Sequence, residues 1–246
     1  MYRLILTNMT GGKEEREALR YRGDHGLRAR ILAQDILNNY SPDAILITGC
    51  SAYQLKYLEA FLWPYGYERI IAPDFSKRKD KFRFTCLTCA YVLRSHKAKQ
   101  IRYDEVTIKT IYRYAGFTLS DGLEIRVVNI PCADSKKPHY DEQLASKEAM
   151  LNWEKSIEEK EISEGKKVVV FGDWNTEIGN LECHDIFDAL PYEKLLDEPT
   201  WRSSKIDNVL VSPNMKGRVK AQVAEYNRYG QTTDHAIILA TAELPH

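Results

Sequence analysis

The chain of 246 residues lacks the features that mark several classes of protein. No apolar run approaches the ~18 residues that a membrane-spanning helix needs, so we expect no contact with a membrane. Residues 1–10 lack the apolar core and cleavage site of a signal peptide and fit a first β-strand better. Five cysteines, an odd number, favour reduced thiols in a cytoplasmic protein. No stretch rich in glycine, serine or proline divides the chain, so residues 1–246 are predicted to form one domain.

Neither sign of charge dominates the sequence. The chain has 35 Lys and Arg residues against 35 Asp and Glu residues, which excludes a protein held to nucleic acid by its bulk charge. The charges are nevertheless unevenly spread, because residues 77–113 contain eleven basic and three acidic side chains. This basic stretch is expected either to meet phosphate groups or to lie on solvated strand faces and loops.

The apolar residues follow helical spacing in some segments and strand spacing in others. Helices are predicted over residues 29–40, 52–62 and 142–163, where apolar residues recur three and four positions apart. Apolar or β-branched runs predict strands over residues 44–48, 67–72, 82–93, 106–115, 123–130, 167–171, 206–211, 218–225 and 236–242. Helices alternate with strands early, and strands cluster in the middle. This order predicts two mixed sheets stacked face to face, with helices outside.

The strongest motif for chemistry is Gly172-Asp173-Trp174-Asn175. It directly follows the apolar run that ends at Phe171, and α/β proteins commonly place their sites at such strand ends. Asp173 can accept a proton from water, and Asn175 can donate a hydrogen bond to a phosphate oxygen. The same composition also suits a turn in which the side chains cap the backbone, so both interpretations stay open.

Two further motifs lie nearer the C-terminus. Asp207 opens the apolar run 206–211, where a buried carboxylate needs a partner. Thr233-Asp234-His235 precedes the last predicted strand. Its aspartate can bind a hard cation, and its histidine can donate a proton or bind a phosphate. His235 is also the natural partner for Asp207, whose carboxylate could orient the imidazole ring.

Taken together, these motifs resemble the endonuclease/exonuclease/phosphatase family, which has the fold of deoxyribonuclease I. The family pattern is GD(F/W)N, then a strand with an Asp, then (S/T)DH, and here GDWN, Asp207 and TDH follow in that order. Residues 42–47, 127–132 and 200–202, and Asn8 after the first strand, extend the resemblance over most of the chain. It implies a four-layer α/β sandwich of two stacked mixed sheets flanked by helices.

The resemblance implies a divalent-cation-dependent phosphodiesterase, a nuclease that acts on DNA and has no obligate protein partner. Asp173 would activate water, Asn175 would hold a phosphate oxygen, and His235 would contact the scissile phosphate with its ring fixed by Asp207. The implied site residues are Asp173, Asn175, Asp207 and His235 for catalysis, Asn8 and Asp234 for Mg²⁺ or Mn²⁺, and Asn129, Trp201 and Arg202 for the substrate.

The sequence departs from the family pattern at two positions. A metal-binding Glu usually follows six residues after the Asp that matches Asp43, and here that position is Gly49. A His or Tyr is usual near Asn129, where this chain has Pro131 and Cys132. A cation held by fewer protein ligands and more water is one interpretation. Two others are a small phosphoester substrate, such as a phosphoinositide or a nucleotide, and a silent protein that only binds nucleic acid or protein.

Overall fold

The computed structural model describes most of the chain. The described residues are 1–9, 22–70, 87–101, 113–133, 135–136, 138–176, 183–201, 203–224, 233 and 235–244. The predicted strand residues 82–86 and 106–112, most of the basic stretch, Arg202 and Asp234 lie outside them. No helix in the described ranges is both long and apolar enough to cross a membrane.

Two six-stranded sheets form the centre of the molecule. The first has the spatial order β11-β12-β1-β2-β4-β3 and the second β5-β6-β7-β8-β10-β9. Each sheet is mixed, because β1 pairs with β2 and β7 with β8 in parallel while the other pairs are antiparallel. The strands are β1 (Tyr2–Asn8), β2 (Ala44–Cys50), β3 (Tyr67–Arg69), β4 (Leu87–Leu93), β5 (Lys99–Gln100), β6 (Tyr114–Thr118), β7 (Glu124–Asn129), β8 (Val168–Asp173), β9 (Glu193–Lys194), β10 (Asp207–Val211), β11 (Val219–Val223) and β12 (Ile238–Ala242).

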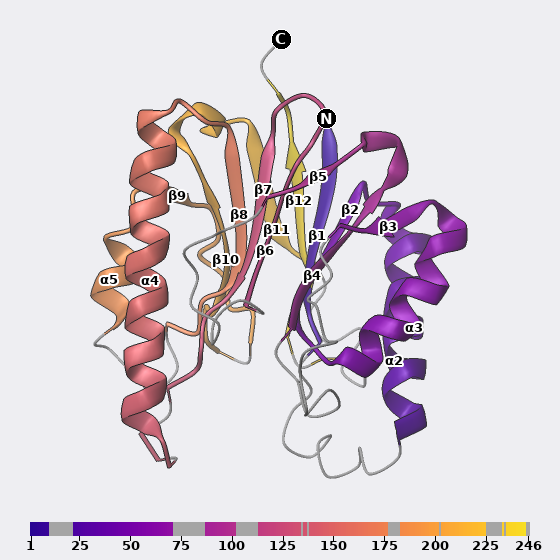
Figure 1. Cartoon of the computed structure of the whole chain (residues 1–246), viewed down its shortest axis with the longest axis horizontal. Coiled ribbons are helices and arrows are strands. Elements are labelled where there is room, and N and C mark those ends of the chain that lie inside the picture. Colours follow the sequence, from indigo (N-terminus) through magenta and orange to yellow (C-terminus); the bar gives the residue numbers. More distant parts are fainter. Residues whose placement is uncertain are drawn as a thin grey trace.

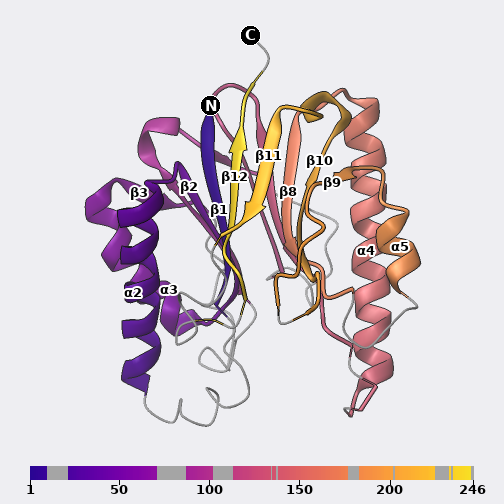
Figure 2. The ribbon, with the colours of Figure 1, turned by 180° about the vertical axis from the view of Figure 1, so that it is seen from behind.

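Helices cover the outer face of each sheet. Figure 1 shows α2 and α3 outside the first sheet and α4 and α5 outside the second, and Figure 2 shows the same arrangement from behind. The four layers confirm the predicted α/β sandwich. The helices are α2 (Arg22–Tyr40), α3 (Ala52–Leu62), α4 (Tyr140–Ser163) and α5 (His184–Asp188), with 3-10 turns η1 (Trp63–Tyr65), η3 (Arg94–His96) and η6 (Pro213–Met215).

The alternation of side chains along the strands produces three apolar layers. Leu6 of β1 packs with Phe171 of β8 in the core between the two sheets. Ile5, the neighbour of Leu6, faces the other way and packs with Leu32 of α2. In the second sheet Val170 likewise belongs to the core beneath α4. Because successive side chains of a strand point to opposite faces, these contacts also assign the faces of the polar residues at the strand ends.

Helix α2 begins earlier than its apolar spacing predicted. The spacing predicted residues 29–40, and the helix starts at Arg22. The apolar residues mark only the part that packs on the sheet, so they give no signal for the first turns. In those turns Gly26 lies against the Tyr57 ring, where a Cβ would lie 2.6 Å from Tyr57 Cδ2. Glycine therefore allows the close approach of α2 and α3.

Helix α4 buries charged residues where an apolar face was expected. Met150 and Leu151 are in the core, Ile157 is half-buried, and Glu154, Glu158 and Glu161 are buried. The apolar spacing that predicted a helix over residues 142–163 gave no sign that these glutamates are buried. Each has a partner in the second sheet or in the segment after α5, which a pattern of local hydrophobicity does not reveal.

The buried glutamates surround Arg126 of β7. Arg126 Nε and Nη2 donate to Glu154 Oε1 at 2.9 and 2.6 Å, and its Nη1 donates to Glu161 Oε1 at 2.6 Å. The Tyr192 hydroxyl donates to Glu161 Oε2 at 2.8 Å, and its backbone N–H donates to Glu158 Oε2 at 3.0 Å. One guanidinium thus faces three carboxyl groups. A proton on one of them therefore lowers the electrostatic repulsion among the buried carboxylates.

We expect Glu158 to make stability depend on pH. Burial, and then the charge of Glu154, raises the pKa of Glu158 to about 8, although Arg126 and Lys194 oppose the shift. An unfolded Glu has a pKa of about 4.3, so the folded state binds the extra proton. The stability that this proton provides is complete below pH ~4.3 and is lost as the pH rises to about 8, by an amount on the order of a few kcal/mol.

Urea unfolding at pH 5.5 and pH 8.5 measures this effect. The wild-type protein should lose more free energy of unfolding between the two values than a Glu158→Gln variant, which cannot titrate at this position. Glu159→Gln, on the exposed side of the same helix, is the matched control and should behave like the wild type. Equal pH dependence in wild type and Glu158→Gln would show that Glu158 keeps no extra proton.

Candidate active site

Polar side chains of three neighbouring strands meet at one end of the second sheet. Asp173 ends β8, and the strand register pairs it with Asp207 of β10 on one side and Asn129 of β7 on the other. Phe171 and Val209, two residues away along β8 and β10, lie in the core between the sheets. By alternation, Asp173 and Asp207 face that inter-sheet space where the apolar core ends.

The first sheet contributes Asn8 to the same place. Its Nδ2 donates to Asp173 Oδ2 at 2.7 Å, and both residues are buried. Asn8 ends β1, and the two strands belong to different sheets, so this hydrogen bond joins the sheets at the site. Asn8 was predicted as a cation ligand, and the structure places it in contact with the central carboxylate.

His235 and Asp207 form the pair that the sequence predicted. His235 Nδ1 lies 2.9 Å from Asp207 Oδ2, and the side chains are 7% and 2% exposed. The Asp207 backbone N–H donates to Thr200 Oγ1 at 2.9 Å, and the His235 backbone N–H donates to Thr233 Oγ1 at 3.1 Å. The ring is therefore held at Nδ1 by the Asp207 carboxylate.

Asp173 and the His235–Asp207 pair lie together. One ligand atom from each of Asp173, Asp207 and His235 can be chosen so that all three lie within 4.8 Å of one another. Burial, and then the charge of Asp207, raises the pKa of Asp173 to about 7, with His235 and Arg113 acting in the opposite direction. A carboxylate with a pKa near neutrality can both accept and release a proton under physiological conditions.

The loop after β8 is fixed by close packing. A Cβ at Gly172 would lie 2.4 Å from Val128 Cγ2 and 2.7 Å from Trp174 Cε2, so only glycine fits there. Trp174 is fully buried and packs against Phe187 of α5. The motif therefore anchors its tryptophan in the core beneath α4 and α5 and leaves its aspartate at the inter-sheet face.

Asn175 adopts a left-handed backbone conformation, with φ of 51°. Its Nδ2 donates to the Ile130 carbonyl at 2.9 Å, and its own carbonyl accepts from Lys147 Nζ at 2.7 Å. Lys147 lies on α4 and is fully buried, and burial lowers its pKa. These two hydrogen bonds hold Asn175 in a conformation that non-glycine residues rarely adopt.

The remaining predicted residues divide into two groups. Asn129 lies beside Asp173 and accepts hydrogen bonds from Arg113 Nη1 at its carbonyl and Oδ1, at 3.2 and 3.1 Å. Trp201 pairs with His235 through a β-bridge, with ring centroids 6.4 Å apart. Arg202 and Asp234 lie outside the described residues, so their assigned roles stay predictions.

Sequence reasoning missed Arg113, Lys147 and Thr200. Arg113 was counted only as part of the basic stretch, although it contacts the Asn129 side chain. Lys147 looks like a solvated residue of a polar helix, and only the tertiary fold shows it beneath the Asn175 loop. Thr200 was noted as part of a family motif, without its contact to the backbone of Asp207.

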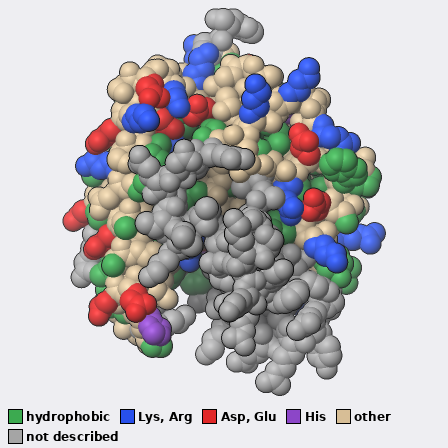
Figure 3. Space-filling view, in the orientation of Figure 1, with side chains coloured by type: hydrophobic (Ala, Val, Ile, Leu, Met, Phe, Trp, Pro, Cys, Tyr) green, Lys and Arg blue, Asp and Glu red, His purple; other side chains and the backbone are tan. Residues whose placement is uncertain are grey.

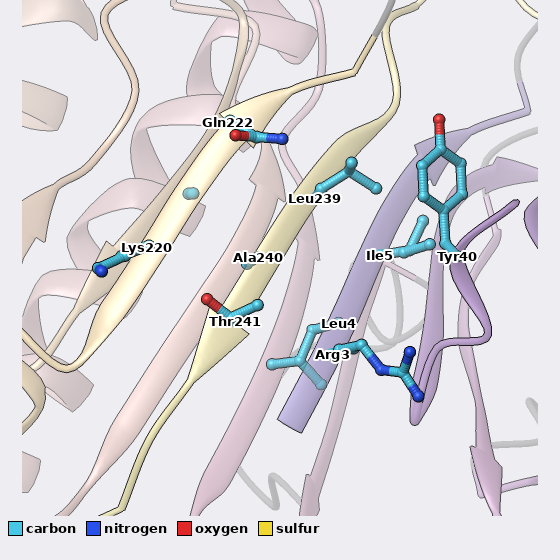
Figure 4. Close-up of a pocket in the computed structure, with 10 residues that line it drawn as sticks. Arg3, Leu4, Ile5, Tyr40, Lys220, Gln222, Leu239, Ala240 and Thr241 are labelled. Atoms are coloured by element: carbon cyan, nitrogen blue, oxygen red, sulfur yellow. The ribbon is translucent and has the colours of Figure 1, made fainter. Parts of the chain in front are cut away.

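A pocket of about 290 Å³ lies away from this site, on the outer face of the first sheet (Figure 4). Strands β1, β11 and β12 and Tyr40 of α2 line it. Among the described residues, its lining includes Arg3 and Lys220 but no histidine, cysteine or carboxylate.

Comparison with known proteins gives a likeness in structure only. No family model matches the sequence, and no curated protein matches it. An AP endonuclease from Archaeoglobus fulgidus has a TM-score of 0.68 at 12% identity, over 99% of this chain and 100% of that chain. A 3'-5' exonuclease from Neisseria meningitidis has a TM-score of 0.66 at 16% identity, over 98% and 99%. A mannosyl-6-phosphatase from Bacteroides thetaiotaomicron has a TM-score of 0.62 at 15% identity, over 99% and 100%.

At identities this low, the superpositions establish the fold alone. They span nearly the whole of each chain. They agree with the two mixed sheets and flanking helices described above. They also agree with the resemblance drawn from GDWN, Asp207 and TDH. The chain therefore has a deoxyribonuclease I-like fold.

Proposed function

We propose that the protein is a divalent-cation-dependent phosphodiesterase that hydrolyses DNA. The observation that carries the proposal is the convergence of Asp173 with the His235–Asp207 pair, all within 4.8 Å, at the end of the inter-sheet core. Hydrolysis of a phosphodiester needs a positioned water, neutralised phosphate oxygens and a stabilised leaving group. Two carboxylates and an imidazole in this arrangement supply the protein's share of those requirements.

The site residues share the chemical tasks of this proposal. Asp173 accepts a proton from the attacking water through Oδ1, because Oδ2 is already bonded to Asn8. His235 contacts the scissile phosphate through Nε2, and Asp207 stabilises the ring and its positive charge through Nδ1. Asn175 contacts a phosphate oxygen through its side-chain amide, whose Nδ2 also donates to the Ile130 carbonyl. Asn129, Trp201 and Arg202 contact the rest of the substrate.

A divalent cation fits this site. Asp173 Oδ1 is buried and has no hydrogen-bond partner among the residues that the structure describes, which is costly for a carboxylate unless a ligand meets it. Asp207 adds a second carboxylate, and oxygen-rich sites suit Mg²⁺ or Mn²⁺. Asp173 and Asp207, with the predicted ligands Asn8 and Asp234, would hold the cation. When bound, the cation would neutralise charge on the phosphate oxygens.

DNA is the substrate that the sequence and the neighbours favour. The basic stretch 77–113 was expected either to meet phosphates or to lie on solvated strand faces and loops. The structure describes Arg94, Lys97, Lys99 and Arg113 of it. On the face shown in Figure 3, Lys and Arg side chains lie interspersed with Asp and Glu. The choice of DNA therefore rests on this stretch and on structural neighbours named as an AP endonuclease and a 3'-5' exonuclease.

Incubation of purified protein with plasmid and single-stranded DNA tests the proposal. We expect cleavage in Mg²⁺ or Mn²⁺ that EDTA abolishes. His235→Ala should slow it by about 10²-fold or more, because the variant loses the group at the phosphate. Asp188→Asn, a change at an exposed carboxylate of α5, should leave the rate unchanged. Absence of cleavage, or cleavage that His235→Ala does not slow, would contradict the proposal.

A small phosphoester is the second candidate substrate. A structural neighbour of similar TM-score is named as a mannosyl-6-phosphatase, which acts on a phosphorylated sugar. Release of inorganic phosphate from a panel of monoesters, with DNA left intact, would favour this function. Tight nucleic-acid or protein binding without hydrolysis of either substrate class would favour the silent binding protein that Gly49 and Pro131 suggested.

A further inference from the structure

A row of polar side chains crosses the first sheet at the site. Asn8 of β1 is paired in register with Thr48 of β2. In the next pair of strands Ile47 is opposite Cys89, which places Thr48 and Thr88 at neighbouring positions. The row therefore runs through β1, β2 and β4, which lie side by side in the sheet (Figure 1).

This row faces the second sheet. Leu6, Leu46 and Ala90, each two residues from a member of the row, belong to the core between the sheets. Alternation therefore turns Asn8, Thr48 and Thr88 toward the same space. The hydrogen bond from Asn8 to Asp173 shows that the row reaches the carboxylate on the opposite sheet.

Three oxygen atoms along this boundary have no hydrogen-bond partner within the described part of the chain. They are Thr48 Oγ1, Thr88 Oγ1 and Asp173 Oδ1, and each is buried. Both threonines are fully buried, and Asp173 is 4% exposed. Buried polar atoms in native proteins nearly always have a partner. Several buried oxygens without one at the same boundary therefore indicate a bound group that these oxygens coordinate.

The backbone between Thr48 and α3 carries no carboxylate that could bind a cation. Gly49 has a φ of 64°, a left-handed conformation that disfavours a side chain, and the pairing of β2 with β4 is irregular between Ile47 and Cys50. Gly49 occupies the position where the family resemblance puts a metal-binding Glu. The strand thus bulges at this point and presents hydroxyl groups beside the bulge instead of a carboxylate.

We propose that Thr48 and Thr88 on the first sheet, together with Asp173 Oδ1 on the second, hold a hydrated divalent cation. The proposal rests on the proposed function, because it adds these two hydroxyl groups to the oxygen ligands of that cation, at a point where residue 49 offers no carboxylate. A hard cation such as Mg²⁺ or Mn²⁺ takes oxygen ligands and keeps several waters when the protein supplies few. Hydroxyl and carboxylate oxygens facing each other across the inter-sheet space meet that preference.

Calorimetric titration of the full chain with Mn²⁺ tests the proposal. The variants are Thr48→Val, Thr88→Val and the double variant, which replace each hydroxyl by a methyl group of similar size. We expect the double variant to bind Mn²⁺ at least about tenfold more weakly than the wild type. Thr48→Ser, which restores a hydroxyl, should bind Mn²⁺ nearly as well as the wild type.

Thr7 provides a matched control. Its hydroxyl is also buried and without a partner, but Thr7 lies beside Asn8 on the opposite face of β1 with Ile5. Thr7→Val should therefore leave Mn²⁺ affinity unchanged. Urea unfolding of each variant, with and without Mn²⁺, verifies the fold, and the stabilisation by Mn²⁺ should shrink for the Thr48 and Thr88 variants alone.

The outcomes separate this inference from the proposed function. Unchanged Mn²⁺ affinity in the double variant would overturn the threonine site, even if DNA is still cleaved in a cation-dependent reaction. Threonine-dependent Mn²⁺ binding in a protein that cleaves no phosphoester would support the cation site and contradict the proposed function. A wild-type protein that binds no Mn²⁺ would contradict both.

Discussion

Replacing Asp173 by asparagine is expected to lower kcat/KM for DNA hydrolysis by about 10³-fold, since a positioned general base typically contributes 10²- to 10⁴-fold. The change keeps the size of the side chain and retains an oxygen that can accept from Asn8. It removes the negative charge and the ability of Oδ1 to accept a proton. Single-turnover cleavage of a labelled oligonucleotide measures the loss without interference from product release.

The control for this prediction must remove a carboxylate without entering the site. Asp188→Asn serves this purpose, because Asp188 ends α5 and its side chain is 58% exposed. Urea unfolding of Asp173→Asn separates a loss of chemistry from a loss of fold. A folded Asp173→Asn variant that cleaves DNA within about threefold of the wild-type rate would mean that Asp173 does not act on the substrate.

Replacing Arg126 by methionine is expected to lower the free energy of unfolding by about 3–5 kcal/mol, the usual cost of breaking a buried ion pair on one side. Arg126 is the cation that Glu154 and Glu161 share, with both contacts at 2.6 Å and all three side chains buried. Without it, the carboxylates must stay charged and unpaired or take up protons. Urea denaturation at pH 7 measures the loss.

A second substitution shows whether the glutamates cause this loss. Adding Glu154→Gln to Arg126→Met should recover part of the stability, because a neutral amide replaces an unpaired buried charge. Arg218→Met, a change at an exposed arginine before β11, should cost little. If Arg126→Met is no less stable than Arg218→Met, the buried network contributes nothing to stability.

The sequence predicted the parts of the fold that depend on local pattern. The strands around Phe171 and Val209 were predicted from apolar runs, because a strand buried on both faces is apolar throughout. The ends of these strands were then the natural places for polar side chains. For this reason the positions of Asp173 and Asp207, and the pairing of Asp207 with His235, could be predicted before the structure.

The unpredicted parts depend on partners far away in the sequence. Glu154 and Glu158 resemble solvent-facing residues until the fold places Arg126 and Tyr192 against them. Lys147 gives no signal that its ammonium group reaches the carbonyl of Asn175. In each case the cost of burial is offset by one long-range contact, and no spacing along the chain encodes that contact.

Thr48 and Thr88 are residues near the site that the sequence could not single out. They are ordinary residues of β-strands, and their sequence context favours a strand without indicating chemistry. Only the register between β2 and β4, and the burial of their hydroxyls without partners, distinguishes them. The bulge at Gly49 likewise appears only in the backbone, where its φ of 64° departs from the strand conformation.

The most direct test is a crystal structure of the wild-type protein with Mn²⁺ and a DNA oligonucleotide that carries a non-hydrolysable phosphate analogue. We expect the scissile phosphate within hydrogen-bond distance of His235 Nε2, about 2.6–3.2 Å, and close to Asp173. We also expect the anomalous signal of Mn²⁺ beside Asp173. A phosphate bound on any other surface, out of contact with Asp173 and His235, would contradict the proposed function.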